Sequence, residues 1–126
     1  MDALLIEGKM TSPAIDFQAG KTLRITGRSI PEHPVKFYQP VDEWLAKYIL
    51  TQPHNLELFI HLDYLNTHST ECVLILFKKL EAYNKQTVNR VKVTWGFDED
   101  DEDMQILGED LSTMVEVPFD IVEIKG

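Results

Sequence analysis

The first clear alternation of apolar and polar positions lies in residues 14–30, "AIDFQAGKTLRITGRSI". Ile15 and Phe17 alternate with polar residues, and Leu23 and Ile25 resume the alternation after the turn-forming run "AGK". A period of two places one set of side chains on one face of a β-strand. The pattern therefore predicts two strands joined by a turn, a β-hairpin.

Prolines separate this hairpin from a predicted helix. The segment "SIPEHPVKFYQP" contains Pro31, Pro34 and Pro40. Because proline fixes φ and lacks a backbone donor, we predict an irregular connection here. Pro40 suits the first turn of a helix, where its missing N–H is no loss. The apolar residues that follow recur at helical spacing and predict one buried face: Val41, Trp44, Leu45, Tyr48 and Ile49.

The segment "NLELFIHLDYL" predicts a central strand. Its apolar residues on one side are Leu56, Leu58, Ile60 and Leu62. Phe59 interrupts the other side, which is otherwise made of Glu57, His61 and Asp63. Apolar residues on both sides are typical of a strand inside a covered sheet, so we expect other elements to cover both faces.

The rest of the chain alternates between helix and strand patterns. A second helix is predicted from the residues near Thr67 to the run "NKQ", with a stripe of Val73, Leu76, Phe77, Leu80 and Tyr83. The segment "VNRVKVTWGF" predicts a strand that begins at Val88. An acidic stretch opens a third helix, whose stripe is Met104, Leu107, Leu111 and Met114. The segment "VPFDIVEI" predicts a last strand.

This order of elements predicts an α/β fold in a single domain, residues 1–126. Helices that alternate with strands after a hairpin favour a mixed sheet of about four to six strands with three helices. Right-handed crossovers between the parallel strands can place all the helices on one face. The length fits one domain with one core.

The net charge of the chain indicates which class of partner to expect. Twelve basic and twenty-one acidic residues give a formal net charge of −9. Such a charge repels the phosphate backbone of nucleic acid, and Lys78-Lys79 is the only pair of adjacent basic residues. We therefore expect protein partners and no nucleic acid.

Hydropathy and cysteine content predict a cytoplasmic location. The longest apolar run, Val73 to Phe77, is far shorter than the roughly 20 residues of a membrane helix, so no membrane association is expected. The first residues, "MDALLIEGKM", lack the pattern of a secretory signal. The single cysteine, Cys72, fits a reducing compartment and is expected to be a buried thiol.

Four polar side chains crowd the junction between the central strand and the second helix: Asn66, Thr67, Ser69 and Thr70. An Asn or Thr at a helix start can cap an unpaired N–H group, which explains Asn66 or Thr67. A capping box from Thr67 would need Glu or Gln where Thr70 stands. A plain cap therefore leaves some hydroxyls unexplained, and a phosphorylation switch is the second interpretation, because a helix start favours a phosphate.

Other groups of polar residues give weaker evidence for a function. The acidic run 98–109 lacks the glycine of a calcium-binding loop. His54, His61 and His68 recur across three different elements, so we expect neither a metal site nor a cofactor. His61 and Asp63 share a strand face near Thr67, which leaves a small hydrolase or ligand-binding domain as the alternative function.

Three ordered segments resemble the SiaC family of bacterial regulatory phosphoproteins. The motif "YLNTHST" resembles the family's "YLNTSS" signature, and "GRSIPEHPVKFYQPVDEWLAKYI" and "DDEDMQILGEDLSTMVEVPFDIVEI" resemble two further segments. The likeness covers essentially the whole chain. It departs at His33, where the family usually has Asn, and at His68, where it usually has Ser. The resemblance implies a small α/β domain similar to the anti-sigma-factor antagonist (STAS, SpoIIAA-like) fold.

The resemblance also implies a function in partner switching, without an enzymatic activity and without catalytic residues. A partner kinase would phosphorylate the signature threonine, which is Thr67, and a PP2C-type phosphatase would remove the phosphate. The unphosphorylated form would bind and activate a diguanylate cyclase. Ser69 is the second candidate acceptor. The residues expected to meet the partner are Tyr64, Asn66, Thr67, His68 and Ser69, framed by the "PEHP" loop.

Overall fold

The computed structural model describes residues 1–87 and 90–125, which form six strands and three helices around one hydrophobic core. The strands are β1 (Leu4–Ile6), β2 (Ala14–Phe17), β3 (Leu23–Ser29), β4 (Leu56–Leu65), β5 (Val91–Asp98) and β6 (Phe119–Ile124). The helices are α1 (Pro34–Leu50), α2 (Thr67–Gln86) and α3 (Glu102–Ser112). The predicted α/β fold with a mixed sheet and three helices is confirmed.

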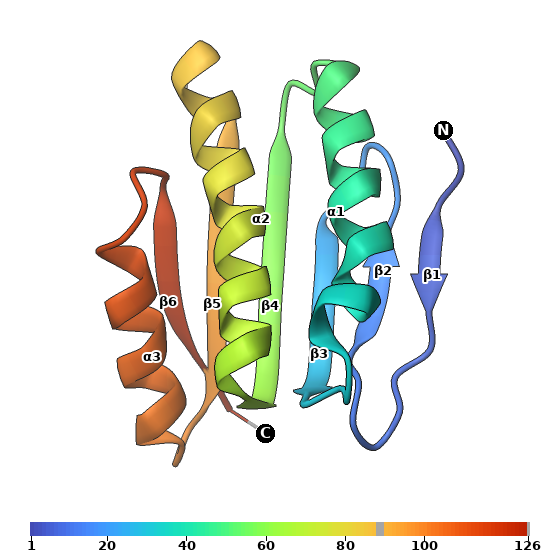
Figure 1. Ribbon diagram of the computed structural model, residues 1–126. Coiled ribbons are helices and arrows are strands. Elements are labelled where there is room, and N and C mark those ends of the chain that lie inside the picture. The colour runs from blue at the N-terminus through green and yellow to red at the C-terminus, as the bar shows by residue number, and fades with distance from the viewer. Residues whose placement is uncertain (88–89, 126) are drawn as a thin grey trace.

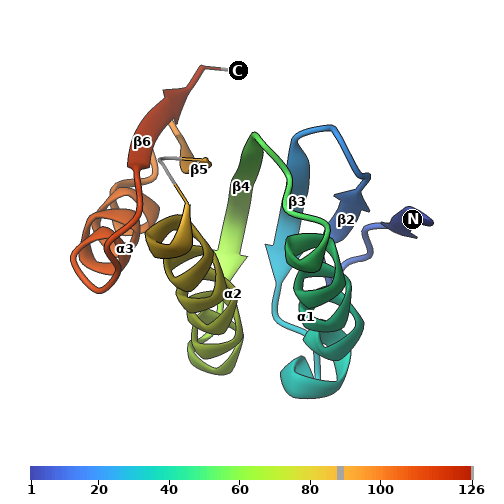
Figure 2. The same ribbon diagram turned by 90° about the horizontal axis from the view of Figure 1, so that it is seen from above.

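The strands form one sheet in the order in which they occur along the chain. The first three pair antiparallel, and β3 to β6 pair parallel. One helix connects each parallel pair. Because crossovers of the same hand that advance in one direction stay on one side, all three helices lie on the same face of the sheet. Figures 1 and 2 show these two layers, with the opposite face of the sheet open.

The predicted hairpin is confirmed, and a further strand joins its edge. Ile15 of β2 lies opposite Ile25 of β3, and both side chains are buried. β1, which the sequence did not predict, pairs antiparallel with β2. Trp44 of α1 donates a hydrogen bond from Nε1 to the carbonyl oxygen of Asp2 at 2.8 Å. A tertiary contact therefore holds the start of the chain beside the sheet.

The first helix begins earlier than predicted, at Pro34 instead of near Pro40. Pro34 takes the first turn, where proline is well tolerated, and the N–H of Phe37 donates to the carbonyl of His33 at 3.0 Å. Pro40 lies inside the helix on an exposed position. Pro40 has no N–H to donate to the carbonyl of Lys36, and both residues are exposed. The predicted irregular connection is therefore shorter.

β4 is the central strand that was predicted, but only one of its faces is covered. It pairs with β3 and β5, and its predicted apolar side is buried. The described helices all lie on that side (Figure 2), so the expectation of cover on both faces is wrong. On the open face the guanidinium carbon of Arg24 lies 5.0 Å from the ring centroid of Phe59. This cation–π contact partly covers the ring.

The remaining elements follow the predicted pattern with two corrections. The predicted stripe of α2 is buried throughout, and so is Cys72. Met114 does not belong to the stripe of α3, because the helix ends at Ser112 and Met114 is 51% exposed. Val88, at which a strand was predicted to begin, lies outside the described residues. Among the helices of the described ranges, none has the length and apolar content needed to span a membrane.

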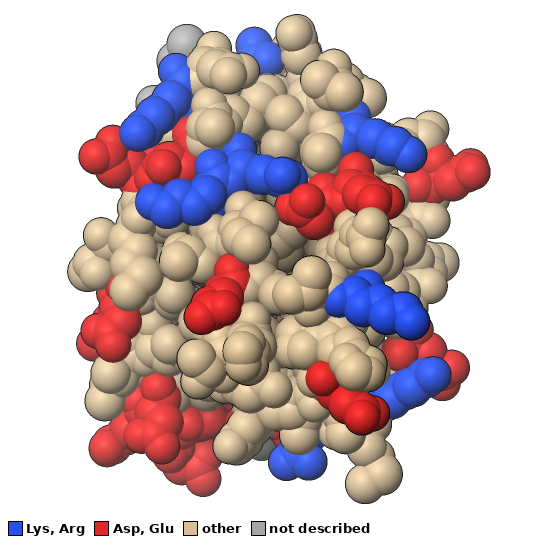
Figure 3. All heavy atoms as spheres, viewed as in Figure 1, with Lys and Arg blue, Asp and Glu red and all other residues tan. Residues whose placement is uncertain are grey.

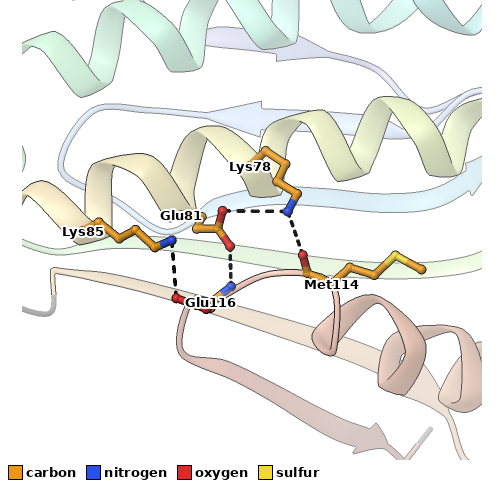
Figure 4. A network of polar contacts seen from close by, with 5 residues as sticks. All are labelled: Lys78, Glu81, Lys85, Met114 and Glu116. Atoms are coloured by element: carbon orange, nitrogen blue, oxygen red, sulfur yellow. Dashed lines mark hydrogen bonds and ion pairs between the residues drawn. The ribbon is translucent and has the colours of Figure 1, made fainter.

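A set of polar contacts ties α2 to the segment between α3 and β6 (Figure 4). The carboxylate of Glu81 accepts a hydrogen bond from the N–H of Glu116. Lys78 donates to the carbonyl of Met114 at 2.8 Å, and Lys85 lies 3.4 Å from the carboxylate of Glu116. The hydrogen bond from Glu116, helped by the two lysines, lowers the pKa of Glu81. These contacts fix the return of the chain into β6.

Candidate functional site

The polar junction lies at the edge of the sheet where β3 and β4 end and where α1 and α2 begin, the lower edge in Figure 1. In sheets of parallel strands this carboxyl edge is where ligand and partner sites are usually built. Each helix start exposes unpaired N–H groups and the positive end of its dipole. Two such helix starts therefore meet at this edge.

Asn66 is the N-cap of α2. Its Oδ1 accepts a hydrogen bond from the N–H of Ser69 at 2.9 Å. Thr70 donates both its N–H and its Oγ1 to the carbonyl of Asn66, each at 2.9 Å. Of the two residues that capping could explain, the structure selects Asn66. Asn66 and Thr70 thus have structural roles in starting the helix.

Ser69 is fully buried, with 0% of its surface exposed. Its Oγ has no hydrogen-bond partner among the residues that the structure describes. Phosphoryl transfer and partner contact both need an accessible side chain. The burial of Ser69 therefore argues against its expected roles as second acceptor and as a partner-binding residue.

Thr67 is the exposed hydroxyl that remains at the start of α2. It occupies the first helical position, and His68, the next residue, is also exposed. Neither the N–H of Thr67 nor that of His68 has an acceptor within residues 1–87 and 90–125. A negative group on Thr67 would therefore lie beside free backbone donors and the positive end of the dipole, which stabilise it by about 0.3–1 kcal/mol.

A buried pair of hydroxyls, which the sequence did not reveal, supports the cap. The N–H of Asn66 donates to the carbonyl of Ser29 at 3.1 Å. The Oγ of Ser29 lies 2.6 Å from the phenol oxygen of Tyr38 on α1, and both residues are buried. These contacts fix the starts of α1 and α2 to the end of β3. The sequence motif "GRSIPE" contains Ser29, but the spacing of residues could not predict that its partner is Tyr38.

Burial raises the pKa of Tyr38 to about 12 from its ordinary value of 10.0. Between these values the unfolded phenol ionises while the folded one stays protonated, so stability is full below about pH 10 and falls as the pH rises towards about 12. We expect the wild-type protein to lose about 1 kcal/mol more than Tyr38→Phe between about pH 9 and about pH 11. Urea unfolding at the two pH values measures the difference. Parallel losses in the two proteins would contradict this role of Tyr38.

A shallow groove joins the start of α2 to the loop before α1. His68 lines it together with Glu32, His33, Pro34, Val35, Lys36 and Gln39. The "PEHP" loop therefore lies beside the signature, and the two positions that depart from the family motif, His33 and His68, share this groove. Tyr64 is 53% exposed at the end of β4 but does not line it.

The chain matches the model of the SiaC family regulatory phosphoproteins over residues 6–124. This chain belongs to the SiaC family. A curated relative, an uncharacterised protein of Pseudomonas aeruginosa (strain UCBPP-PA14), is 32% identical over 123 residues, which are 96% of each chain. The resemblance found in the sequence is thereby confirmed.

Two solved structures of family members share this fold. SiaC of Pseudomonas aeruginosa matches with a TM-score of 0.89 and 26% identity, over 98% of this chain and 100% of that one. A chain in the crystal structure of the diguanylate cyclase SiaD in complex with its activator SiaC, from the same organism, matches with a TM-score of 0.87 and 27% identity. That match covers 96% of this chain and 99% of the other.

The alternative hydrolase site is not assembled in this SiaC-family chain. His61 Nε2 lies 2.8 Å from Asp98 on β5, whereas Asp63 lies 3.8 Å from Arg28. The pairing of β3 with β4 contains a β-bulge next to Gly27, whose φ is +109°. In this bulge Asp63 of β4 has no partner residue on β3. The proposed base and its orienting acid thus have different partners. His61 sits on the open sheet face.

Two residues of the acidic run 98–109 also have structural roles in this family member. Asp101 caps α3 by accepting a hydrogen bond from the N–H of Met104 at 3.1 Å. Asp98 pairs with His61. In residues 1–87 and 90–125, no group of three or more His, Cys, Asp or Glu side chains is arranged to hold a metal ion.

Proposed function

We propose that this chain is a phosphorylation-controlled adaptor that works by binding and has no catalytic turnover of its own. The observation that carries the proposal is the exposure of Thr67 at the start of α2. The other polar side chains of the junction are used in capping or are buried. Thr67 is therefore the phosphate acceptor.

The unphosphorylated form binds and activates a diguanylate cyclase. Support comes from the structural neighbour that is an activator in complex with the cyclase SiaD, and from the family of regulatory phosphoproteins to which this chain belongs. The docking surface lies around Thr67 and includes Tyr64 and His68, both of which are exposed. Asn66 shapes this surface through its cap.

A partner kinase and a PP2C-type phosphatase set the state of Thr67. The kinase transfers the γ-phosphoryl group of ATP to Thr67 Oγ1 and releases ADP and the hydroxyl proton. The phosphatase hydrolyses the ester with water and releases inorganic phosphate.

The proposal is tested by intact and peptide mass spectrometry of the protein purified from its own host. We expect one phosphate, on Thr67. Thr67→Ala should abolish it, whereas the matched variants Ser69→Ala and Thr70→Ala should keep it, because neither hydroxyl is the acceptor. A phosphate found on another residue, or none under conditions in which the pathway is active, would refute the assignment.

A further inference from the structure

Two of the four histidines of this chain lie in one groove beside Thr67. His33 ends the loop before α1 and is the N-cap of that helix, and His68 is the second residue of α2. Both are exposed and line the shallow groove between these two segments. His61 lies on the open face of the sheet, and His54 lies in the loop before β4, at the opposite edge of the sheet. The fold therefore brings imidazoles from two distant segments next to the candidate acceptor.

The imidazoles of His33 and His68 have no hydrogen-bond or ion-pair partner among the residues that the structure describes. His33 occupies the N-cap position of α1, but its side chain makes no cap hydrogen bond. The histidine that does have such a partner is His61, which pairs with Asp98. Because the ring nitrogens of His33 and His68 are unused, each imidazole can donate hydrogen bonds to a ligand in the groove.

Protonation of these histidines decides the net charge of the groove. Its other charged lining residues are Glu32 and Lys36, whose charges are opposite and cancel. A histidine side chain ordinarily changes its charge between about pH 5 and 8. The net charge of the lining therefore rises from 0 to +2 when both imidazoles are protonated, in a chain whose formal net charge is −9. The groove can thus become a basic site beside Thr67.

The elements around the groove carry further charges. On α2, Glu71 lies about one turn beyond His68 and is exposed. At the ends of β3 and β4, Arg28 and Asp63 pair with each other at 3.8 Å. Figure 3 shows acidic side chains gathered at the lower left, over the start of α3. The carboxylates among these groups would repel a phosphate on Thr67, and protonated histidines in the groove would offset that repulsion.

A phosphate on Thr67 matches the chemistry of this groove. Phosphothreonine carries about −1.5 to −2 charges and three acceptor oxygens, with a second pKa near 6. A protonated imidazole donates from both ring nitrogens and forms short, charge-assisted hydrogen bonds to such oxygens. The pairing is strongest at about pH 6–7, because above this range the imidazoles lose their protons and below it the phosphate gains one.

We propose that His33 and His68, when protonated, bind the phosphate on Thr67 in the free protein. The phosphate then bridges the start of α2 and the loop before α1. This inference rests on the proposed function and deepens it by adding a pH-dependent stabilisation of the modified form. A docked partner would exclude water from the groove and favour neutral imidazoles, so the pairing belongs to the partner-free form.

The ionisation of the phosphate itself tests this pairing. Cationic partners stabilise the doubly charged phosphate and lower its second pKa. In a phosphorus NMR titration of the phosphorylated protein, we expect this pKa to be about 0.5 lower in the wild type than in the double variant His33→Asn/His68→Ser. Both replacements place polar side chains at exposed positions, and Asn is a favoured N-cap, so the fold is kept. Equal pKa values in the two proteins would overturn the proposal.

Single variants and a matched control locate the effect. His33→Asn and His68→Ser should each raise the pKa of the phosphate by about half of this difference. His54→Asn removes an exposed histidine at the opposite edge of the sheet and should leave the pKa of the phosphate within about 0.1 of the wild-type value. A change with His68→Ser alone would mean that the phosphate does not reach the loop before α1, and it would overturn the bridge.

The outcomes separate this inference from the proposed function. If Thr67 carries the phosphate but its pKa is the same in the wild type and the double variant, the histidine pair fails and the adaptor function stands. If no phosphate is found on Thr67 in the host, both fail. If the pKa is lower in the wild type, and phosphorylation weakens the cyclase complex in both proteins, both stand, because release of the partner needs the phosphate and not the pair.

Discussion

Phosphate on Thr67 is expected to weaken the complex with the cyclase by about a hundredfold or more, which corresponds to about 2.7 kcal/mol. The modification adds about −1.5 to −2 charges. In the free protein, solvent and the start of α2 stabilise these charges, because Thr67 is exposed beside unpaired N–H groups. Under a docked partner the same charges lose their water and have no basic mate, which costs several kcal/mol. The fold therefore tolerates the phosphate, whereas the complex does not.

Titration calorimetry with the phosphorylated and unphosphorylated protein measures this loss. Thr67→Asp, with one charge, should give a smaller loss of about tenfold. Ala82→Asp is the matched control, because it adds the same charge to an exposed position of the same helix, about 22 Å further along. It should leave the affinity within about twofold. Equal affinity of the phosphorylated and unmodified protein would contradict the switch.

The sequence predicted an element correctly where a local apolar repeat alone determines its bounds and its buried face. The bounds and the buried stripe of α2 follow from an apolar repeat that continues for the whole helix. The predicted start of α1, near Pro40, was wrong. A proline usually marks a helix boundary, but Pro40 lies inside α1 on its exposed side. β1 has only three residues and depends on pairing with β2 and on the bond between Trp44 and Asp2. No local pattern could have predicted it.

The candidate site likewise contains residues that the sequence could predict and contacts that it could not. Thr67 could be selected from the sequence because a motif and a helix start point to it. That Ser69, two residues later, is buried depends on which side of α2 faces the sheet at its first turn. His33 and His68 are far apart in the sequence. Their common groove exists only because α1 and α2 pack side by side, which spacing along the chain does not reveal.

The contact of α3 with the sheet depends on Gly108, and Gly108→Ala is expected to lower the free energy of unfolding by about 2–3 kcal/mol. A methyl group at this position would lie 2.4 Å from Cδ1 and 2.6 Å from Nε1 of Trp95. The indole is fully buried, and its Nε1 donates to the carbonyl of Met104 at 3.0 Å. It cannot move aside without losing that bond. In an exposed helix the same change would stabilise by up to about 1 kcal/mol, so the packing reverses the sign.

Urea and thermal unfolding measure this effect, which for a chain of this size lowers the melting temperature by roughly 10 °C. Trp95→Phe provides the control, because the smaller ring leaves room for the methyl group. If the indole is the obstacle, Gly108→Ala should cost less than about 1 kcal/mol in the Trp95→Phe background. An equal cost in both backgrounds would place the obstacle elsewhere in α3. Gly108 lies inside α3, whereas Thr67 begins α2, so the variant should still be phosphorylated on Thr67 while it remains folded.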